Sequence, residues 1–250
     1  MKSTALLTAL LSLVTLARAS VTETFTYTYP LTADGVIRVE NVNGDIDITA
    51  WDKAEVSLVA EKRARDGDEL KRVEIIIDAA PARLSIKTKF AKKTGGWFFR
   101  NWNNNSSVRY KLLVPAGARL EKIDTVNSDI TVTGVHGTVN LDTVNGSVTA
   151  HGLAADARLD SVNGSLHAEF DSLEKVREVK LESVNGRAEV TLPKGASASI
   201  RTSTVNGSSR IDQPVKLSKS GRHNLSGEIG SGGPDISLKT VNGSISVREK

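Results

Sequence analysis

The stretch Leu159–Ala168 reads Leu-Asp-Ser-Val-Asn-Gly-Ser-Leu-His-Ala, and its centre, Val-Asn-Gly, recurs along most of the chain. Seven copies occur, one with Ser in place of Gly, and they begin at Val42, Val126, Val144, Val162, Val184, Val205 and Val241. Successive asparagines of these copies are 84, 18, 18, 22, 21 and 36 residues apart. A period near 20 residues with strand-like content is typical of a β-solenoid, in which each repeat is one coil of a stack.

The residues around each Asn alternate in polarity on both sides of the motif. Apolar residues stand four before it in most copies and three and five after it, as Leu159, Leu166 and Ala168 do around Asn163. This period of two predicts two short strands per coil, joined at a corner, with one face of each strand turned inward. Stacked coils place like residues roughly 4.8 Å apart, so the apolar columns form a core. The Thr or Ser two residues before each Asn can form a hydroxyl ladder in the same way.

The asparagines are the expected structural ladder. Asn and Gly adopt positive φ more easily than other residues, which suits a corner, and stacked amides can bond from coil to coil. Asn-Gly also marks two-residue hairpins, but a hairpin does not explain a column at a nearly fixed period. The ladder comprises Asn43, Asn127, Asn145, Asn163, Asn185, Asn206 and Asn242.

The end of the chain and the valines of the motif complete the expected stack. The interval of 36 is twice 18 and Asn224 stands halfway, which predicts a degenerate coil there and places Asn242 near the end of the stack. The charged residues 248–250 would then blunt the open edge. The Val before each Asn has outward parity; either the corner turns it inward or it forms a second apolar stripe that something else covers.

The chain divides into three expected parts. Residues 1–19 have a basic start, an apolar run and an Ala-Arg-Ala cleavage site, which predicts a secretory signal peptide. Residues 20–118 form an N-terminal β region with the first coil and inserted strands, and residues 119–250 form the solenoid repeats. No stretch after the signal has the length of a membrane helix, and the chain has no Cys. We therefore expect an exported protein, periplasmic or released to the cell surface or medium.

The interval of 84 residues carries its own strand patterns. Strands are expected in it at 54–64, 72–78, 83–90 and 108–114, with a turn at 66–68 and a hairpin connection at 79–82. The first strand, at 21–29, and the first coil, at 35–50, come before these inserted strands. The fold class is therefore all-β, a β-solenoid of coils of about 18–22 residues with an inserted N-terminal antiparallel β region.

A family resemblance follows from the segment Leu113–Gly117, from Thr125–Ile130 and from the later Val-Asn-Gly copies. The chain resembles the bacterial putative-adhesin family of unknown function, also called the toastrack domain, over nearly all of its length after the signal. The resemblance implies a role at the cell surface or envelope. It brings no catalytic residues with it.

Two charged columns share the outward parity. Three residues before the Asn stand the acids Glu40, Asp124, Asp142, Asp160 and Glu182; five before it stand Arg38, Lys122, Arg158, Lys180 and Arg201, with Asn140 in one gap. Because the basic column neutralises the stacked acids, a solvated lattice of ion pairs is the favoured interpretation. A Ca²⁺ site and a pair of hydrolytic carboxylates are the alternatives.

The remaining residues bound the chemistry. His136, His151, His167 and His223 show no metal-ligand spacing and are expected to be isolated surface residues, so neither a metal nor a cofactor is predicted. The formal net charge of the whole chain is +4, and removal of Lys2 and Arg18 leaves +2, which does not favour nucleic acid as a partner.

The stretch 87–111 is the strongest binding candidate, because it is basic and aromatic and contains no acid. The predicted contact residues are Lys92, Lys93, Trp97, Phe98, Phe99, Arg100 and Trp102. Large aromatic residues in a loop either pack back onto the core or contact a partner. The partner would be a component of the envelope: a glycan, an anionic lipid or a protein. The oligomeric state is left open.

These patterns predict a non-enzymatic, exported protein of the cell envelope that acts as an adhesin or binding scaffold. The alternative is a β-helical polysaccharide-processing enzyme that uses the stacked carboxylates.

Overall fold

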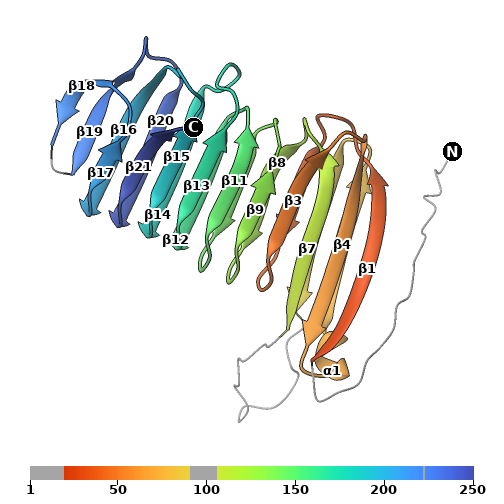
Figure 1. The fold of residues 1–250 in the computed structure, drawn as a ribbon. Coiled ribbons are helices and arrows are strands. Elements are labelled where there is room, and N and C mark those ends of the chain that lie inside the picture. The colour runs from red at the N-terminus through yellow and green to blue at the C-terminus, as the bar shows by residue number, and fades with distance from the viewer. Residues whose placement is uncertain (1–19, 91–105, 222) are drawn as a thin grey trace.

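Two long β-sheets face each other and enclose a single apolar core (Figure 1). The computed structural model describes residues 20–90, 106–221 and 223–250. Sheet A has ten strands, in spatial order β1 (Val21–Pro30), β4 (Glu55–Ala64), β7 (Ser107–Pro115), β3 (Ile46–Trp51), β9 (Ile130–Thr133), β11 (Val148–Leu153), β13 (Leu166–Phe170), β15 (Ala188–Leu192), β21 (Ile245–Glu249) and β17 (Ser209–Ile211).

Sheet B is the second layer. Its eleven strands are, in spatial order, β18 (Val215–Ser220), β19 (Asn224–Ile229), β16 (Ala198–Asn206), β20 (Asp235–Asn242), β14 (Glu178–Asn185), β12 (Ala157–Asn163), β10 (Val139–Thr143), β8 (Arg119–Thr125), β2 (Val36–Glu40), β6 (Arg83–Phe90) and β5 (Val73–Ala80). Within the described residues, no helix is both long enough and apolar enough to cross a membrane.

Each coil contributes one strand to each sheet, and the corner of the motif joins them. The strand β12 pairs in parallel with β10 and β14, and Leu159 lies opposite Leu141 and Leu181. Across the corner, Leu166 on β13 lies opposite Val148 and Ala188. These side chains are almost completely buried, so the alternation in the sequence becomes the stacked columns of the core. The expected all-β solenoid is confirmed.

The inserted strands extend the stack at its N-terminal end. The strand β6 pairs in parallel with β2, and β7 pairs in parallel with β3, so together they continue the two sheets by one position. The strands β1 and β4 join sheet A in antiparallel orientation, and β5 forms an antiparallel hairpin with β6. Residues 66–68, expected as a turn, lie at the start of the one-turn helix α1 (Gly67–Leu70), whose N-cap Asp66 accepts a hydrogen bond from the Glu69 amide.

The order of the coils departs from the sequence expectation at the C-terminal end. The strand β20, which carries Asn242, lies between β14 and β16 and pairs in parallel with both. The coil of Asn242 therefore fills a position between the coils of Asn185 and Asn206 and does not end the stack. Similarly, β21 lies between β15 and β17, so residues 248–250 do not blunt the open edge.

Asn224 does not belong to a degenerate coil. It begins β19, which pairs antiparallel with β16 on one side and with β18 on the other. The hairpin of β18 and β19 covers the edge of sheet B that the last parallel strand would expose. The halfway position of Asn224 in the sequence is therefore a coincidence of spacing.

The corner glycines have a different role from the one expected. Among the described residues, only Gly44 of the motif glycines has positive φ, and no residue other than glycine has it. At Gly164, an added Cβ would lie 1.7 Å from the carbonyl oxygen of Gly146 in the neighbouring coil. Glycine is needed because the backbones of successive corners approach too closely for a side chain, and not because the corner is left-handed.

Candidate functional site: the valine–carboxylate face of sheet B

The outer face of sheet B carries three parallel columns of side chains. Along β12, Arg158, Asp160 and Val162 point outward in turn from the return loop to the corner. The neighbouring strands repeat the pattern in register, so Asp160 lies opposite Asp142 on one side and Glu182 on the other. The basic, acidic and valine columns therefore run side by side along the stack.

The valine column is exposed. Its members on successive coils have 36–60% of their surface accessible: Val126, Val144, Val162, Val184, Val241 and Val205. Neither of the two arrangements predicted for these valines is fully correct, because the corner does not turn them inward and no described segment covers them. This apolar stripe crosses six coils near the ends of their strands. An exposed stripe of this length is unusual for a protein surface and typical of a contact site.

The Thr or Ser residues that stand two before each Asn form a hydroxyl column, which lies beneath the valines and bonds to the backbone of the corners. Ser161 Oγ donates a hydrogen bond to the Gly146 carbonyl at 2.9 Å, and Ser183 Oγ donates to the Gly164 carbonyl at 3.0 Å. Five hydroxyls of the column bond the backbone of an adjacent coil in this way, whereas Thr125 Oγ1 has no hydrogen-bond partner among the described residues. The hydroxyls therefore do not form the ladder that the sequence suggested. They satisfy corner carbonyls that would otherwise be buried without partners.

The asparagine side chains form a continuous chain of amide hydrogen bonds beside the valines. Asn163 Nδ2 donates to Asn145 Oδ1 at 2.9 Å, and Asn185 Nδ2 donates to Asn163 Oδ1 at 2.8 Å. The chain continues through Asn242 to Asn206, with distances of 2.8 and 2.9 Å. At the other end it reaches Asn43 through Asn127. Most of these side chains are exposed, and their hydrogen bonds join successive corners beside the valine column.

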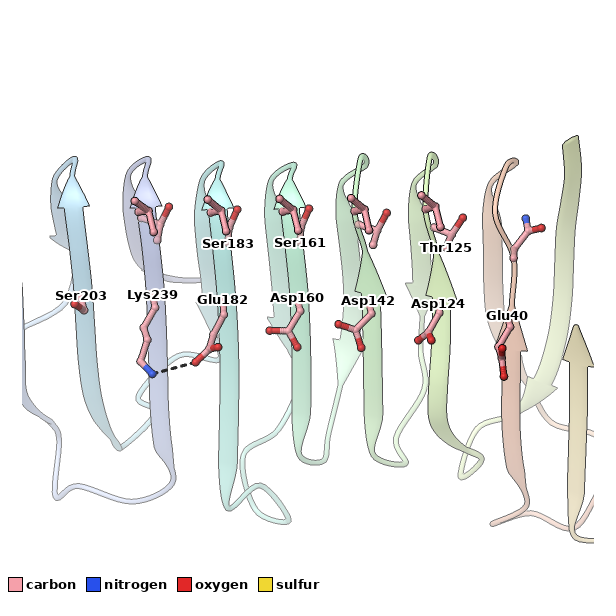
Figure 2. A pocket seen from close by; sticks show the side chains of 18 of the residues that line it. Glu40, Asp124, Thr125, Asp142, Asp160, Ser161, Glu182, Ser183, Ser203 and Lys239 are labelled. Atoms are coloured by element: carbon pink, nitrogen blue, oxygen red, sulfur yellow. Dashed lines mark hydrogen bonds and ion pairs between the residues drawn. The ribbon is translucent and has the colours of Figure 1, made fainter. Parts of the chain in front are cut away.

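Most of the acidic column is neutralised by cations. The Lys87 ammonium lies 2.6 Å from Glu40 at one end of the column. At the other end the Lys239 ammonium lies 3.0 Å from Glu182, the pair that Figure 2 shows with a dashed line. Between them, Lys122 pairs with Asp124 at 3.1 Å and Arg158 pairs with Asp160 at 2.7 Å. Four of the five carboxylates thus have a cation partner, but only Lys122 and Arg158 come from the expected basic column. The other members of that column pair elsewhere, so the expected lattice is present only in part: Arg38 with Glu121, Lys180 with Glu178 and Arg201 with Asp235.

Asp142, in the middle of the column, is the exception. No cation of the described residues lies within ion-pair distance of its carboxylate, because the neighbouring position of the basic column is Asn140. Burial, followed by the negative charges of Asp160 and Asp124, raises the pKa of Asp142 to about 6. Burial also raises the pKa of Asp160, although Arg158 opposes it. The column therefore has one carboxylate that would gain from a cation supplied by a ligand.

The acidic, valine and hydroxyl columns line a groove of about 810 Å³, here named the valine–carboxylate groove. It runs from Glu40 on β2 to Val205 on β16 and includes all five acids of the column and the six exposed valines. Figure 2 shows the carboxylates in a row across successive strands, with the hydroxyl side chains nearer the corners. The sequence contained the signals for this site, namely the outward parity of the valines and the gap at Asn140.

The predicted aromatic contact residues Lys92, Lys93, Trp97, Phe98, Phe99, Arg100 and Trp102 lie outside the described residues. The flanks of that stretch are described. Lys87 pairs with Glu40, Arg109 pairs with Asp45 at 3.0 Å, and Tyr110 is completely buried. The Tyr110 hydroxyl bonds Thr88 Oγ1 at 2.8 Å, and burial raises its pKa to about 12. Tyr110 is therefore a core residue and not part of a contact surface.

Two histidines that were expected to be isolated lie together on the outer face of sheet A. The ring centroids of His151 and His167 are 5.3 Å apart. His167 lies opposite Thr149 in the regular part of the register, so His151, two residues further along β11 and on the same outward face, is its diagonal neighbour. The two histidines stand six and four residues after the Asn of their copies and thus fall in different columns of the repeat, so the prediction of isolated histidines was wrong for this pair.

The fold is a two-sheet β-solenoid with parallel stacked strands, and one of its faces carries an elongated groove. A family model described as Toastrack DUF4097 matches residues 24–248, so the chain belongs to this family. No curated protein shows significant similarity to it.

Two solved structures are similar to the chain. The chain is similar to a "putative cell adhesion protein" from Clostridium sporogenes, with 14% identity, a TM-score of 0.51, and coverage of 91% of this chain and 100% of that one. It is also similar to a "putative adhesin" from Bacteroides fragilis, with 15% identity, a TM-score of 0.39, and coverage of 91% and 97%. The first similarity supports the same arrangement of sheets in the two proteins.

Proposed function

We propose that this protein is an exported, adhesin-like binding scaffold of the cell envelope, and that it binds its partner in the valine–carboxylate groove without catalysis. The observation that supports the proposal is the position of Asp142 beside the exposed Val144 and Val162; no cation of the described residues lies at ion-pair distance from this carboxylate, although Arg158 acts on it from further away. A ligand that places a cation at Asp142 and apolar groups on the valines would satisfy both features at once.

This chemistry selects among the possible envelope partners. A Lys or Arg side chain supplies the cation, and neighbouring aliphatic residues supply the apolar contact, so an extended segment of a protein fits the groove best. An anionic lipid would be repelled by the acidic column. A neutral glycan would leave Asp142 without a counter-charge.

The polysaccharide-processing alternative uses the same carboxylates differently. A carboxyl group with a pKa near 6 next to an ionised one resembles the acid and base of a glycosidase. Against this, the neighbours Asp124 and Asp160 are held by Lys122 and Arg158, so the described column lacks a second free carboxylate. Binding is therefore the function that the groove supports better.

The binding experiment uses a labelled octapeptide with one Lys among Val and Ser residues, and a matched peptide with Glu in place of Lys. We expect the Lys peptide to bind the intact protein, and Asp142→Asn to weaken binding at least fivefold. Asp68→Asn, an exposed carboxylate on α1, serves as the control and should not change the affinity. Equal affinity for the two peptides, or an unchanged affinity of Asp142→Asn, would contradict the proposal.

A separate incubation with envelope polysaccharides tests the alternative. We expect no release of reducing ends. Turnover that is abolished by Asp142→Asn would establish the enzyme instead.

The basic aromatic residues 92–102 provide a second proposed contact, directed at anionic envelope components. The described residues on either side of this stretch are Phe90, the last residue of β6, and Ser106, which lies next to the corner of Asn43. Asn43 Nδ2 donates to the Ser106 carbonyl at 3.2 Å, so Ser106 is bonded to the end of the asparagine ladder.

The proposal that the protein is exported rests on the signal-like residues 1–19. Cell fractionation with N-terminal sequencing of the exported protein tests it.

A further inference from the structure

We infer that His151, His167 and Glu169, on the outer face of sheet A, form a binding site for a divalent transition-metal ion such as Zn²⁺. One ligand atom from each of these residues lies within 4.8 Å of the others. His151 belongs to β11, whereas His167 and Glu169 belong to the adjacent β13. The site therefore bridges two coils of the stack, and it is independent of the groove on the other sheet.

The local geometry holds the three side chains close together. His151 Nδ1 lies 2.9 Å from Glu169 Oε2, and the two imidazole rings are tilted by 56° at a centroid distance of 5.3 Å. Donors around a tetrahedral Zn²⁺ at 2.0–2.2 Å lie about 3.4 Å apart. Small side-chain rotations would therefore bring the three donors to one ion while the backbone stays in place.

The donor types select the metal. Two imidazole nitrogens and one carboxylate oxygen suit Zn²⁺ and other late first-row ions, whereas Ca²⁺ and Mg²⁺ prefer oxygen ligands alone. Three protein ligands leave at least one coordination position for water or an outside ligand. A second carboxylate, Glu189, lies 3.4 Å from His167 Nδ1 and is placed to orient that ring.

The surrounding cations compete with a metal for the carboxylates. The Lys250 ammonium lies 2.6 Å from Glu169 Oε1 and also contacts Asp171, and Arg248 lies 3.3 Å from Glu189. Lys250 contacts Oε1 of Glu169, whereas His151 contacts Oε2, so the ammonium would place its positive charge beside a metal bound at Oε2. Removal of this ammonium should therefore strengthen the binding of the metal, a direction that a merely structural ion pair would not produce.

Calorimetric titration of tag-free protein with ZnCl₂, after treatment with a chelator, tests the site. We expect one equivalent of Zn²⁺ to bind, and His151→Ala and His167→Ala each to weaken the affinity at least tenfold. His136→Ala, which removes an exposed histidine outside the cluster, is the matched control and should leave the affinity unchanged. Lys250→Ala should tighten the binding several-fold, and CaCl₂ should not compete.

Two results would overturn the inference. The first is a Zn²⁺ affinity that is the same in wild type and in the variant that lacks both His151 and His167. The second is an affinity that Lys250→Ala leaves unchanged or weakens. Because Lys250→Ala alters an exposed side chain, this arm remains decisive even if a histidine variant does not fold, and the absorption spectrum of the Co²⁺-substituted wild type reports nitrogen coordination directly.

Discussion

The middle of the stack and its C-terminal end are built from the same columns, but only in the middle does the spatial order of the coils follow their order in the sequence. In the middle, β8, β10, β12 and β14 follow one another in sequence and in space. At the end, β20 returns to occupy the position between β14 and β16, and Leu238 still lies opposite Leu181. The repeat therefore specifies which residues meet across strands, whereas the connections decide which coil occupies which position.

The two regions also differ on their outer faces. In the middle, the acidic column presents Asp124, Asp142 and Asp160, whereas towards the end it continues with Lys239 and Ser203. Lys239 neutralises Glu182 and closes the acidic run. The proposed contact for a ligand cation is thus confined to the middle coils, although the valines continue to Val205.

The largest difference in stability should come from the corner glycines. Gly164→Ala places Cβ against the Gly146 carbonyl between two neighbouring coils, and we expect a loss of about 3 kcal/mol in the free energy of unfolding. Gly207→Ala makes a similar contact with Gly243, but the coil of Gly207 is the last of the parallel stack and can shift more easily, so the loss should be smaller. Denaturant unfolding measures both. Gly67→Ala, where an added Cβ meets nothing within 4 Å, is the control.

Substitution of the ladder asparagines should distinguish interior coils from the last one. Asn163→Ala and Asn242→Ala each remove two amide bonds, so both should cost about 1 kcal/mol, near the lower limit because water reaches these side chains. Asn206→Ala removes one such bond and should cost less. Thermal unfolding of the three variants decides the order. A smaller loss for Asn242→Ala than for Asn206→Ala would contradict the order of coils described above.

Asp142→Asn should stabilise the protein at neutral pH. The pKa of Asp142 is about 6 in the folded protein and near 3.8 when unfolded, so between these values only the folded state keeps the proton. The unfolded carboxyl ionises in this range while the folded one stays protonated, so stability falls as the pH rises from about 4 to about 6, and the variant should lack this loss. We expect a gain of about 1–2 kcal/mol at pH 7, less than the full shift implies because the carboxyl is partly exposed. Unfolding curves at pH 4, 5, 6 and 7 measure it; equal pH dependence of the two proteins would contradict the assignment.

The smallest effect on stability is expected for the aromatic residues outside the described chain. Trp97→Ala together with Phe98→Ala should leave the melting temperature nearly unchanged and weaken binding to vesicles that contain anionic lipid. The electrostatic part of this binding should fall with salt, because exposed charges are screened over about 10 Å at 0.1 M. Neutral vesicles are the control. A large fall in melting temperature with unaltered binding would assign these rings to the core.

The sequence predicted those features that depend on the regular register of the strands. The strand at 83–90 and the facing of Leu159 with Leu141 and Leu181 follow from alternation and period alone. The gap at Asn140 was visible in the aligned columns, and it marks Asp142 as the carboxylate of the column that has no cation at ion-pair distance among the described residues. The division into residues 20–118 and 119–250 stays a prediction.

Other features could not be predicted, for identifiable reasons. The position of β20 leaves every column intact, so no residue pattern distinguishes it from a coil at the end of the stack. The contact between His151 and His167 was missed because the two residues fall in different columns of the repeat and meet only as diagonal neighbours on adjacent strands. The need for Gly164 arises from the distance between backbones of two coils, which the sequence does not contain.

The most direct test of the proposed contact surface measures the affinity of the Lys octapeptide for the double variant Val144→Thr with Val162→Thr. These changes keep the shape of each side chain and remove apolar surface from the groove next to Asp142. Leu113→Thr, which alters an exposed apolar residue on sheet A, is the control. We predict at least fivefold weaker binding by the double valine variant, with unchanged binding by the Leu113 variant and folded protein in both. Equal affinity of wild type and the double valine variant would contradict the assignment of the groove as the binding surface.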